Sequence, residues 1–321
     1  MKNFKTPEDT EVFKHDKIYK VSDRKELDRL IKACIMAFSK HCDLNWIDVS
    51  GITDFSNLFR YHELNKDFTF NGDISRWDVS NATTMAGMFV GCSMFRGAGF
   101  DGDLSKWDVS NVKDMSHMFE DSSFNKDISM WDVSNVENMS HMFHDSYFDN
   151  DISKWDVSNV KTMTYMFSYS SFTGDISEWN VSNVEDMKAM FYMSRFDGDI
   201  SLWNVRNVKN MDYMFNGSCF SGDISNWNVR NLESRMFMFT GSDIPVEAWK
   251  NREYFNVLCE AYDFNKISSN REKTKAITDN MKKAAYSQVI ERLLEGKINP
   301  HDRAIKKIFN TDNIYKPETL V

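Results

Sequence analysis

Aspartates recur along the middle of the chain, each at the start of an Asp-Ile-Ser or Asp-Leu-Ser tripeptide. They are Asp73, Asp103, Asp127, Asp151, Asp175, Asp199 and Asp223. Stacked repeats would bring these carboxylates into one column, and carboxylate oxygens are ligands that Ca²⁺ prefers. Each aspartate can instead accept hydrogen bonds from backbone and serine donors at a turn. We predict the turn-capping role, with bridging calcium sites as the alternative.

Two histidines, His117 and His141, are the other residues whose spacing suggests metal chemistry. They occupy equivalent positions in consecutive repeats, so their imidazoles could share one ion. The same column continues with Tyr165, Ala189 and Tyr213, and then Phe237, so no third ligand follows in register. We therefore predict a solvated column, with no metal site and no cofactor.

Catalytic chemistry has few candidates, because the sequence contains no nucleophile–base constellation and no phosphate-binding loop. Insertions at 60–70 and 90–100 are the only breaks in the repeat, and they contain His62, Glu63 and Cys92. A solenoid enzyme that cleaves glycans with paired carboxylates is an alternative. The aspartates, however, belong to the repeat itself, whereas an active site should interrupt the repeat at one coil. We predict that the protein is not an enzyme.

Tryptophan marks the repeat that must position these side chains. Six tryptophans are spaced 24 residues apart, and Trp77 precedes the first of them by 30. The six are Trp107, Trp131, Trp155, Trp179, Trp203 and Trp227. A typical unit runs WDVSNVENMSHMFHDSYFDNDISK from Trp131 to Lys154. Self-similarity at a fixed period of this length is typical of a solenoid, in which each coil contacts its neighbours.

Each unit has two halves with different periodicity. Residues 112–119 carry apolar side chains spaced as on one face of a short helical turn. Residues 127–133 are rich in β-forming types, with Trp131 and Val133 alternating inward. We expect an α/β solenoid of about eight coils, each with one short parallel strand and one helical turn. Ile128 would be out of phase with Trp131, so a bend is expected between them.

Bulky side chains are unusually frequent for so polar a chain: 20 Met, 25 Phe and 9 Trp in 321 residues with a mean hydropathy of −0.52. No apolar run approaches the roughly 18–20 residues of a membrane span. An aromatic content of 14% excludes general disorder. Regular methionine pairs, from Met85/Met88 to Met211/Met214, are expected in the core rather than on an adaptable binding face. The bulky residues thus predict a core that is renewed in every unit.

The flanks of the repeat differ from it. Residues 1–46 are expected to cap the first coil, with an amphipathic helix at 22–42. Ser22 or Asp23 would be its N-cap, with Glu26 completing a capping box. Its apolar stripe is Leu27, Leu30, Ile31, Cys34 and Phe38. The repeat spans 47–242, and residues 243–321 are expected to be helical.

Charge is unevenly divided along the chain, whose net charge is −9. Residues 266–321 carry +5 and residues 1–46 carry +2, so −16 lies between them. This balance disfavours nucleic-acid binding by the solenoid. The basic tail would either dock back on the acidic repeat or reach a separate acidic partner.

The repeat unit D-I-S-x-W-D-V-S-N-V-x-x-M-x-x-M-F-x-x-S-x-F resembles that of a bacterial and mycoplasma surface-protein family, which is grouped with the BspA-like leucine-rich repeats. The resemblance covers about residues 47–242. It implies leucine-rich-repeat-like coils and a binding role, often at a cell surface. It carries over no catalytic residue, because the motif is structural.

Two kinds of column follow from stacking. The structural ladder comprises asparagines expected to bond the backbone at a coil corner, Asn111, Asn135, Asn159, Asn183 and Asn207, together with the tryptophans from Trp107 to Trp203. The residue before each tryptophan varies freely, as an outward-facing position should. We predict partner binding there and at two late arginines: Arg76, Lys106, Met130, Lys154, Glu178, Leu202, Asn226, Arg206 and Arg230.

These observations favour a non-enzymatic scaffold that binds a partner protein, for example as an effector or inhibitor that occupies its target. The charged N-terminus has no secretory pattern, and the five scattered cysteines form no disulfide framework, so a cytoplasmic location is expected. The alternative is a cell-surface or secreted adhesin of the BspA-like type.

Overall fold

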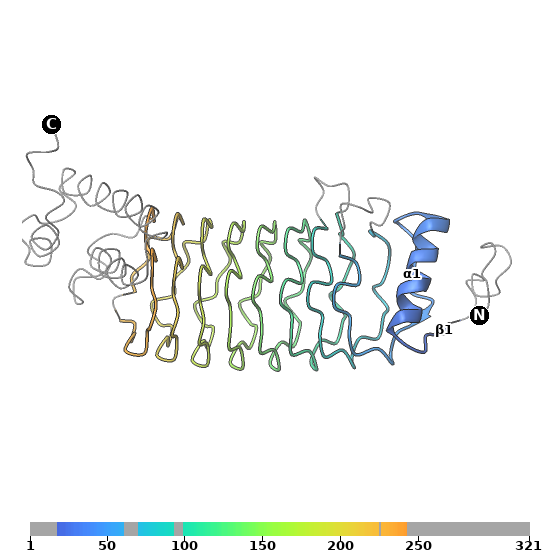
Figure 1. Ribbon diagram of the computed structural model, residues 1–321, viewed down its shortest axis with the longest axis horizontal. Coiled ribbons are helices and arrows are strands. Elements are labelled where there is room, and N and C mark those ends of the chain that lie inside the picture. Colours follow the sequence, from blue (N-terminus) through green and yellow to red (C-terminus); the bar gives the residue numbers. More distant parts are fainter. Residues whose placement is uncertain (1–17, 61–69, 93–98, 225, 243–321) are drawn as a thin grey trace, which may run out of the picture.

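The computed structural model describes residues 18–60, 70–92, 99–224 and 226–242, which form successive coils stacked side by side along one axis (Figure 1). The three regular elements of these residues all lie at the N-terminal end: β1 (Tyr19–Lys20), α1 (Arg24–Phe38) and β2 (Ile47–Asp48). β1 pairs in parallel with β2, with Tyr19 opposite Ile47. The helices expected after residue 242 lie outside the described residues.

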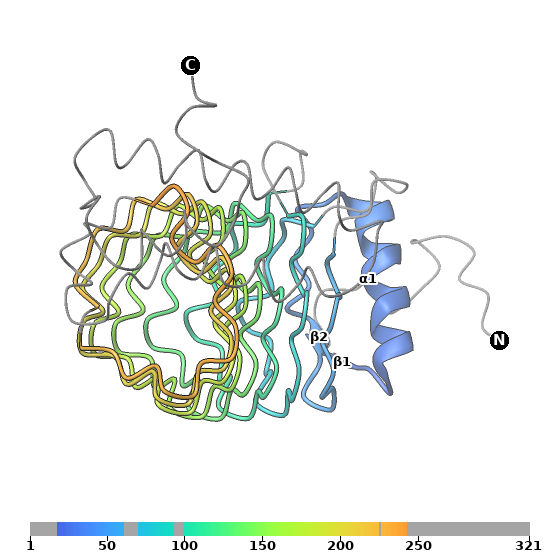
Figure 2. The same ribbon diagram turned by 60° about the vertical axis from the view of Figure 1, so that its left-hand side comes forward.

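α1 lies across the first coil (Figure 2) and begins as the sequence predicts. The Asp23 side chain accepts the Glu26 N–H at 2.8 Å, and the Glu26 carboxylate accepts the Ser22 N–H at 2.7 Å. The helix is shorter than the predicted 22–42, because Ser39 has a φ of 91° and leaves the helical region.

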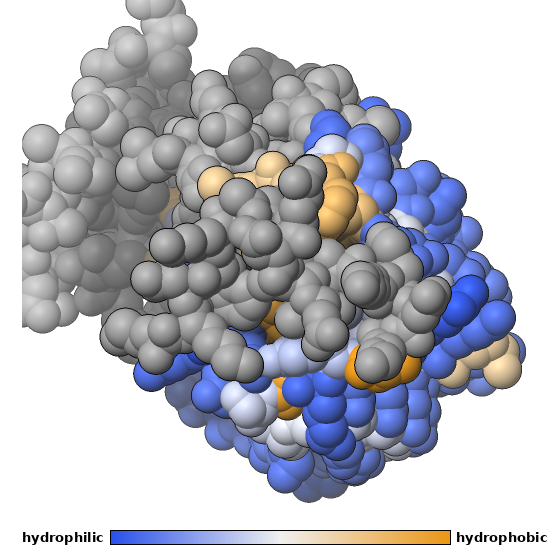
Figure 3. Space-filling model, turned by 90° about the vertical axis from the view of Figure 1, so that its right-hand side faces the viewer, coloured by the Kyte–Doolittle hydropathy of each residue, from blue (hydrophilic) through white to orange (hydrophobic). Residues whose placement is uncertain are grey.

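The apolar stripe of α1 faces the coils, with one difference from the prediction. Four of the five expected residues are buried, but Phe38 is 49% exposed and Ile35 lies in the core instead. Phe38 is the last residue of the helix, where the chain turns away. Seen from this end, the described surface is mostly hydrophilic with local apolar areas (Figure 3). Its exposed large apolar side chains are Ile18, Met36 and Phe38.

Pairing between coils is parallel, and at the N-terminal end it includes the predicted half, between Asp43 and Asp73 and between β1 and β2. In the described coils that follow, the bridges lie in the opposite half of the unit from the one predicted. Residues 127–133 form no strand. There the Trp131 N–H donates to the Ile128 carbonyl at 3.1 Å, which is the bend expected between these two residues. Single parallel bridges run instead through the other half: Asp54–Thr84, Thr84–Asp114, Asp114–Asn138, Asn138–Thr162, Thr162–Asp186, Asp186–Asn210 and Asn210–Ser234.

Residues 112–119 are reverse turns paired to the next coil, so the helical turn predicted there is wrong. The N–H groups of Met115, His117 and Phe119 donate to carbonyls of the next coil at 3.0, 2.8 and 3.0 Å. The Met118 N–H, between them, bonds the Met115 carbonyl of its own coil at 3.2 Å. His117 has a φ of 58°, and this left-handed residue prevents helical hydrogen bonding.

Left-handed residues of the described coils fall into two columns, and together these columns form what we call the left-handed corner. The first column, with φ of 52–65°, is Asn57, Gly87, His117, His141, Tyr165, Ala189, Tyr213 and Phe237. The second, with φ of 50–73°, is Gly91, Asp121, Asp145, Tyr169, Met193, Gly217 and Gly241. Because the conformation recurs in every coil, it belongs to the architecture rather than to one strained site.

The core is built from columns of identical side chains. Phe143 is fully buried, and its ring stacks on Phe119 and Phe167, each at 5.8 Å between centroids, and on Phe148 at 4.3 Å. All the methionine pairs from Met85/Met88 to Met211/Met214 are fully buried as well. Burial of this kind contributes roughly 1.5–3 kcal/mol per large apolar side chain.

Columns of tryptophan and asparagine side chains hydrogen-bond each coil to the preceding coil. The indole N–H of Trp155 donates to the Ile128 carbonyl of the preceding coil at 3.1 Å, and the same bond recurs from Trp77 to Trp227. The Asn135 amide donates to the Ser110 carbonyl at 2.8 Å. Asn111, Asn159, Asn183 and Asn207 make the equivalent contact. These asparagines and tryptophans bond the backbone of the neighbouring coil.

A column of alternating charge runs beside the parallel bridges, and the sequence analysis does not anticipate it. Its members are Lys113, Glu137, Lys161, Glu185, Lys209 and Glu233. Lys161 pairs with Glu137 across adjacent coils, and Lys209 pairs with Glu185 at 2.5 Å. Exposed ion pairs contribute only about 0–1 kcal/mol each, so the core provides most of the stability.

Candidate functional site

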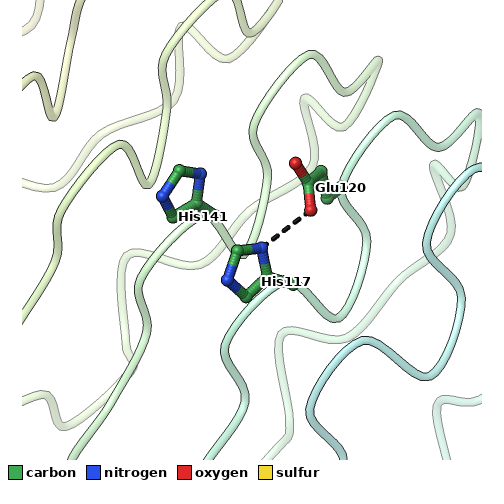
Figure 4. A group of neighbouring side chains, drawn as sticks. All are labelled: His117, Glu120 and His141. Carbon is green, nitrogen blue, oxygen red and sulfur yellow. Dashed lines mark hydrogen bonds and ion pairs between the residues drawn. The ribbon is translucent and has the colours of Figure 1, made fainter. Parts of the chain in front are cut away.

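The left-handed corner brings His117, Glu120 and His141 together (Figure 4). His117 and His141 come from adjacent coils at the same corner position, and Glu120 follows His117 by three residues. The Glu120 N–H donates to the His117 carbonyl at 3.2 Å. This hydrogen bond closes a turn that places the glutamate beside the histidine. Donor atoms of the three side chains all lie within 4.8 Å of one another. Among the described residues, this is the single group of histidine, cysteine and acidic side chains so arranged.

The two imidazoles are stacked rather than splayed apart. Their ring centroids are 4.5 Å apart with an interplanar angle of 11°, and His141 stacks in turn on Tyr165 at 4.7 Å. Nδ1 of His117 is 2.7 Å from Oε2 of Glu120. His144 lies edge-on to His141 at 5.4 Å. The corner therefore concentrates three imidazoles around one carboxylate.

Burial controls the protonation of this cluster. It lowers the pKa of His141 to about 4, and the neighbouring His117 and His144 add to the effect. His141 is thus neutral near pH 7, with a free lone pair on its ring. Burial also opposes ionisation of Glu120, but the hydrogen bond from His117 and the nearby imidazoles hold its pKa below the ordinary value. At neutral pH the cluster therefore offers the neutral imidazole of His141 and the carboxylate of Glu120 as donors.

The histidine column contains no third ligand in register, as predicted, but it is half-buried rather than fully solvated, and an acidic side chain from outside the column lies beside it. The third donor does not follow in the same column; it comes from the same coil as His117. The sequence signal that could have identified it is His-Met-Phe-Glu at 117–120, in which one turn brings the first and fourth residues together. The His117 side chain is 43% exposed and that of Glu120 is 25% exposed, so the cluster is half-buried.

The aspartate column caps turns. Oδ1 of Asp127 accepts the Ser129 N–H at 2.9 Å, and Asp73, Asp103, Asp151, Asp175 and Asp199 make the same contact. In Asp127, Asp151, Asp175 and Asp199 this backbone N–H, followed by the serine hydroxyl, lowers the pKa of the carboxyl group. Each carboxylate therefore has a structural task within its own coil.

Acid is expected to weaken the folded state through these aspartates. Their pKa is lower in the folded chain than in the unfolded one. Their stabilising contribution is therefore complete above the unfolded pKa and is lost as pH falls through the folded pKa. We expect the urea midpoint to fall between about pH 5 and pH 2. A triple Asp127→Asn, Asp151→Asn, Asp175→Asn variant should show a smaller fall, because asparagine still accepts the N–H without titrating. An equal fall in both proteins would contradict this assignment.

All nine residues predicted to bind a partner are exposed. Seven of them form the column before the tryptophans, which we call the pre-tryptophan column: Arg76, Lys106, Met130, Lys154, Glu178, Leu202 and Asn226. Met130 and Leu202 are 84% and 78% exposed, although each is a large apolar side chain. Arg206 and Arg230 lie near this column, where earlier coils have serine. The structure thus brings these residues to the surface but not into the histidine cluster.

Three further exposed apolar side chains were not identified from the sequence. Tyr147, Tyr169 and Met193 are 46%, 49% and 47% exposed, and the latter two belong to the left-handed corner. The exposure of Tyr169 and Met193 could not be assigned without the left-handed turns in which these two residues lie.

Of the three candidate catalytic residues, the structure describes Cys92 alone. His62 and Glu63 lie outside the described residues. Cys92 is fully buried, its thiol donates to the Phe59 carbonyl at 3.4 Å, and burial raises its pKa to about 12. A thiol in this state is a poor nucleophile.

No helix among the described residues is both long and apolar enough to cross a membrane. Comparison with curated proteins and with solved structures gives no match. A family model described as a Mycoplasma protein of unknown function, DUF285, matches four overlapping stretches: residues 25–145, 93–195, 144–251 and 168–274. The matches together extend over more than half of the chain, and their overlap is that of a repeat protein. The chain therefore belongs to this Mycoplasma repeat family.

Proposed function

We propose that this protein is a non-enzymatic scaffold that binds a partner protein through the pre-tryptophan column. The observation that carries the proposal is the exposure of Met130 and Leu202 in a column where the repeat does not dictate residue type. Methionine is enriched in protein–protein interfaces relative to the rest of the protein surface, which supports Met130 as a contact residue. Lys106 and Lys154 flank Met130 in the same column and supply charge for partner selection.

The scaffold is expected to lose its partner when this column is altered. The test compares capture of one discrete partner from the native cell extract by wild-type protein and by a Lys106→Glu, Met130→Asp, Lys154→Glu variant. We expect at least a tenfold loss, since a desolvated anchor contributes about 1–2 kcal/mol or more. A matched control, Lys113→Glu with Lys126→Glu, reverses two exposed charges in other columns. Equal capture by the three proteins would remove this face from the proposal.

We also propose that the stacked coils are a solenoid of the BspA-like leucine-rich-repeat type and that the protein works in the cytoplasm. The repeat motif and the family match support the first part. The unpaired thiols support the second: Cys34, Cys42, Cys92 and Cys219 are all free. A surface adhesin is the competing function, favoured by the resemblance to surface proteins. Cell fractionation separates the two, because an adhesin would be recovered with the cell envelope.

A further inference from the structure

We propose that His117, Glu120 and His141 bind one divalent transition-metal ion, for which Zn²⁺ is the probe. Two imidazole nitrogens and one carboxylate oxygen are a donor set that Zn²⁺ uses in proteins, with a fourth position left open. The ion would bridge two adjacent coils at the left-handed corner. This site is separate from the pre-tryptophan column and does not depend on the proposed scaffold function.

The donors are already close to the required separation. Ligand atoms about 2.0–2.2 Å from a tetrahedral Zn²⁺ lie roughly 3.3–3.5 Å from one another. The donor atoms here lie within 4.8 Å, so side-chain rotation without backbone movement can bring them together. The side chains of His117 and Glu120 are partly exposed, and this rotation would replace their mutual hydrogen bond with contacts to the ion.

An unpartnered nitrogen provides independent support. Nδ1 of His141 is buried and has no hydrogen-bond partner, and the same is true of Nδ1 of His144 beside it. A buried polar atom without a hydrogen-bond partner destabilises the folded state, because its lost hydration is not replaced. In Figure 4 one ring nitrogen of His141 lies on the side of Glu120, towards the space shared with His117. A metal ion in that space would provide the missing partner.

Ring stacking determines how the ion would bind. Imidazole lone pairs lie in the ring plane, so two rings only 11° from parallel cannot direct their lone pairs at one ion. His117 must therefore rotate out of the stack, whereas His141 remains on Tyr165, 14° from parallel. Binding should thus separate the two histidines while leaving the remaining aromatic column in place.

The test is calorimetric titration of the metal-stripped full-length protein with ZnCl₂. We expect the wild-type protein to bind one more equivalent than the His141→Asn and Glu120→Gln variants, or to bind it at least tenfold more tightly. His117→Asn is a third variant, and it introduces the residue type that the chain itself has at Asn57 of the same column. His41→Asn is the matched control, because His41 is an exposed imidazole away from the cluster.

Two further readouts separate a site from general histidine binding and from misfolding. Zn²⁺ should raise the melting temperature of the wild-type and His41→Asn proteins but not of the three cluster variants. Unchanged circular dichroism without metal would show that those variants fold. Equal stoichiometry and affinity in all five proteins would overturn the proposal.

Discussion

Replacing Phe143 by alanine is expected to lower the free energy of unfolding by about 3–5 kcal/mol, the usual cost of removing a buried aromatic ring. Phe143 is fully buried and stacks on phenylalanines of both neighbouring coils as well as on Phe148 of its own coil. The cavity would therefore open in the middle of a continuous column, where neither neighbour can collapse without losing its own contacts. Urea unfolding followed by circular dichroism measures the effect.

Met130→Ala is the matched control for that experiment. It also removes a large apolar side chain, but one that is 84% exposed, so a change within about 0.5 kcal/mol is expected. Similar losses in the two variants would mean that the phenylalanine column does not carry the stability of the stack.

Gly72→Ala is expected to destabilise the protein by about 1–3 kcal/mol, because the added methyl group has no space. A Cβ at Gly72 would lie 1.9 Å from the carbonyl oxygen of Cys42 and 2.7 Å from the ring of Phe70. The same carbonyl accepts the Asp73 N–H at 3.2 Å, so relieving the clash would separate two coils at a hydrogen bond.

Gly51→Ala provides the comparison for Gly72→Ala, since a Cβ there meets nothing within 4 Å. We expect its melting temperature to stay within a few degrees of the wild-type value, which corresponds to less than about 1 kcal/mol. An equal decrease for the two alanine variants would show that the close approach of the coils at Gly72 is not tightly constrained.

The sequence predicts the core of this protein well, because each buried column repeats at one fixed spacing. Trp131, Phe143 and the methionine pairs are found where that spacing places them. The β-forming side chains of residues 127–133 led to the prediction of strand pairing in that segment. The chain turns at Ile128 instead, so these residues form no strand. The left-handed residues in the other half direct alternate N–H groups to the next coil, and nothing in the type of residue at Tyr165 or Phe237 favours that conformation.

The sequence predicts two of the three side chains of the candidate metal site to be neighbours, but not the third. The relation between His117 and His141 follows from the repeat alone, since equivalent positions must be neighbours in a stack. Glu120 could not be placed without the turn at His117, because a helix and a left-handed turn send the fourth residue in different directions. The variable exposed column was predictable as a surface, but the chemistry of a partner is not encoded in a residue pattern of one chain.

The alternating column from Lys113 to Glu233 gives the surface a longer period than the core. The core repeats with every coil, whereas the charge pattern repeats only after two. Loss or duplication of a single coil from the interior of this column would preserve the spacing of the core residues but would bring two lysines or two glutamates side by side. Loss or duplication of a pair of coils would preserve both patterns. Within this column the number of coils can therefore change by two without placing like charges side by side, whereas a change by one interior coil would create a like-charged pair.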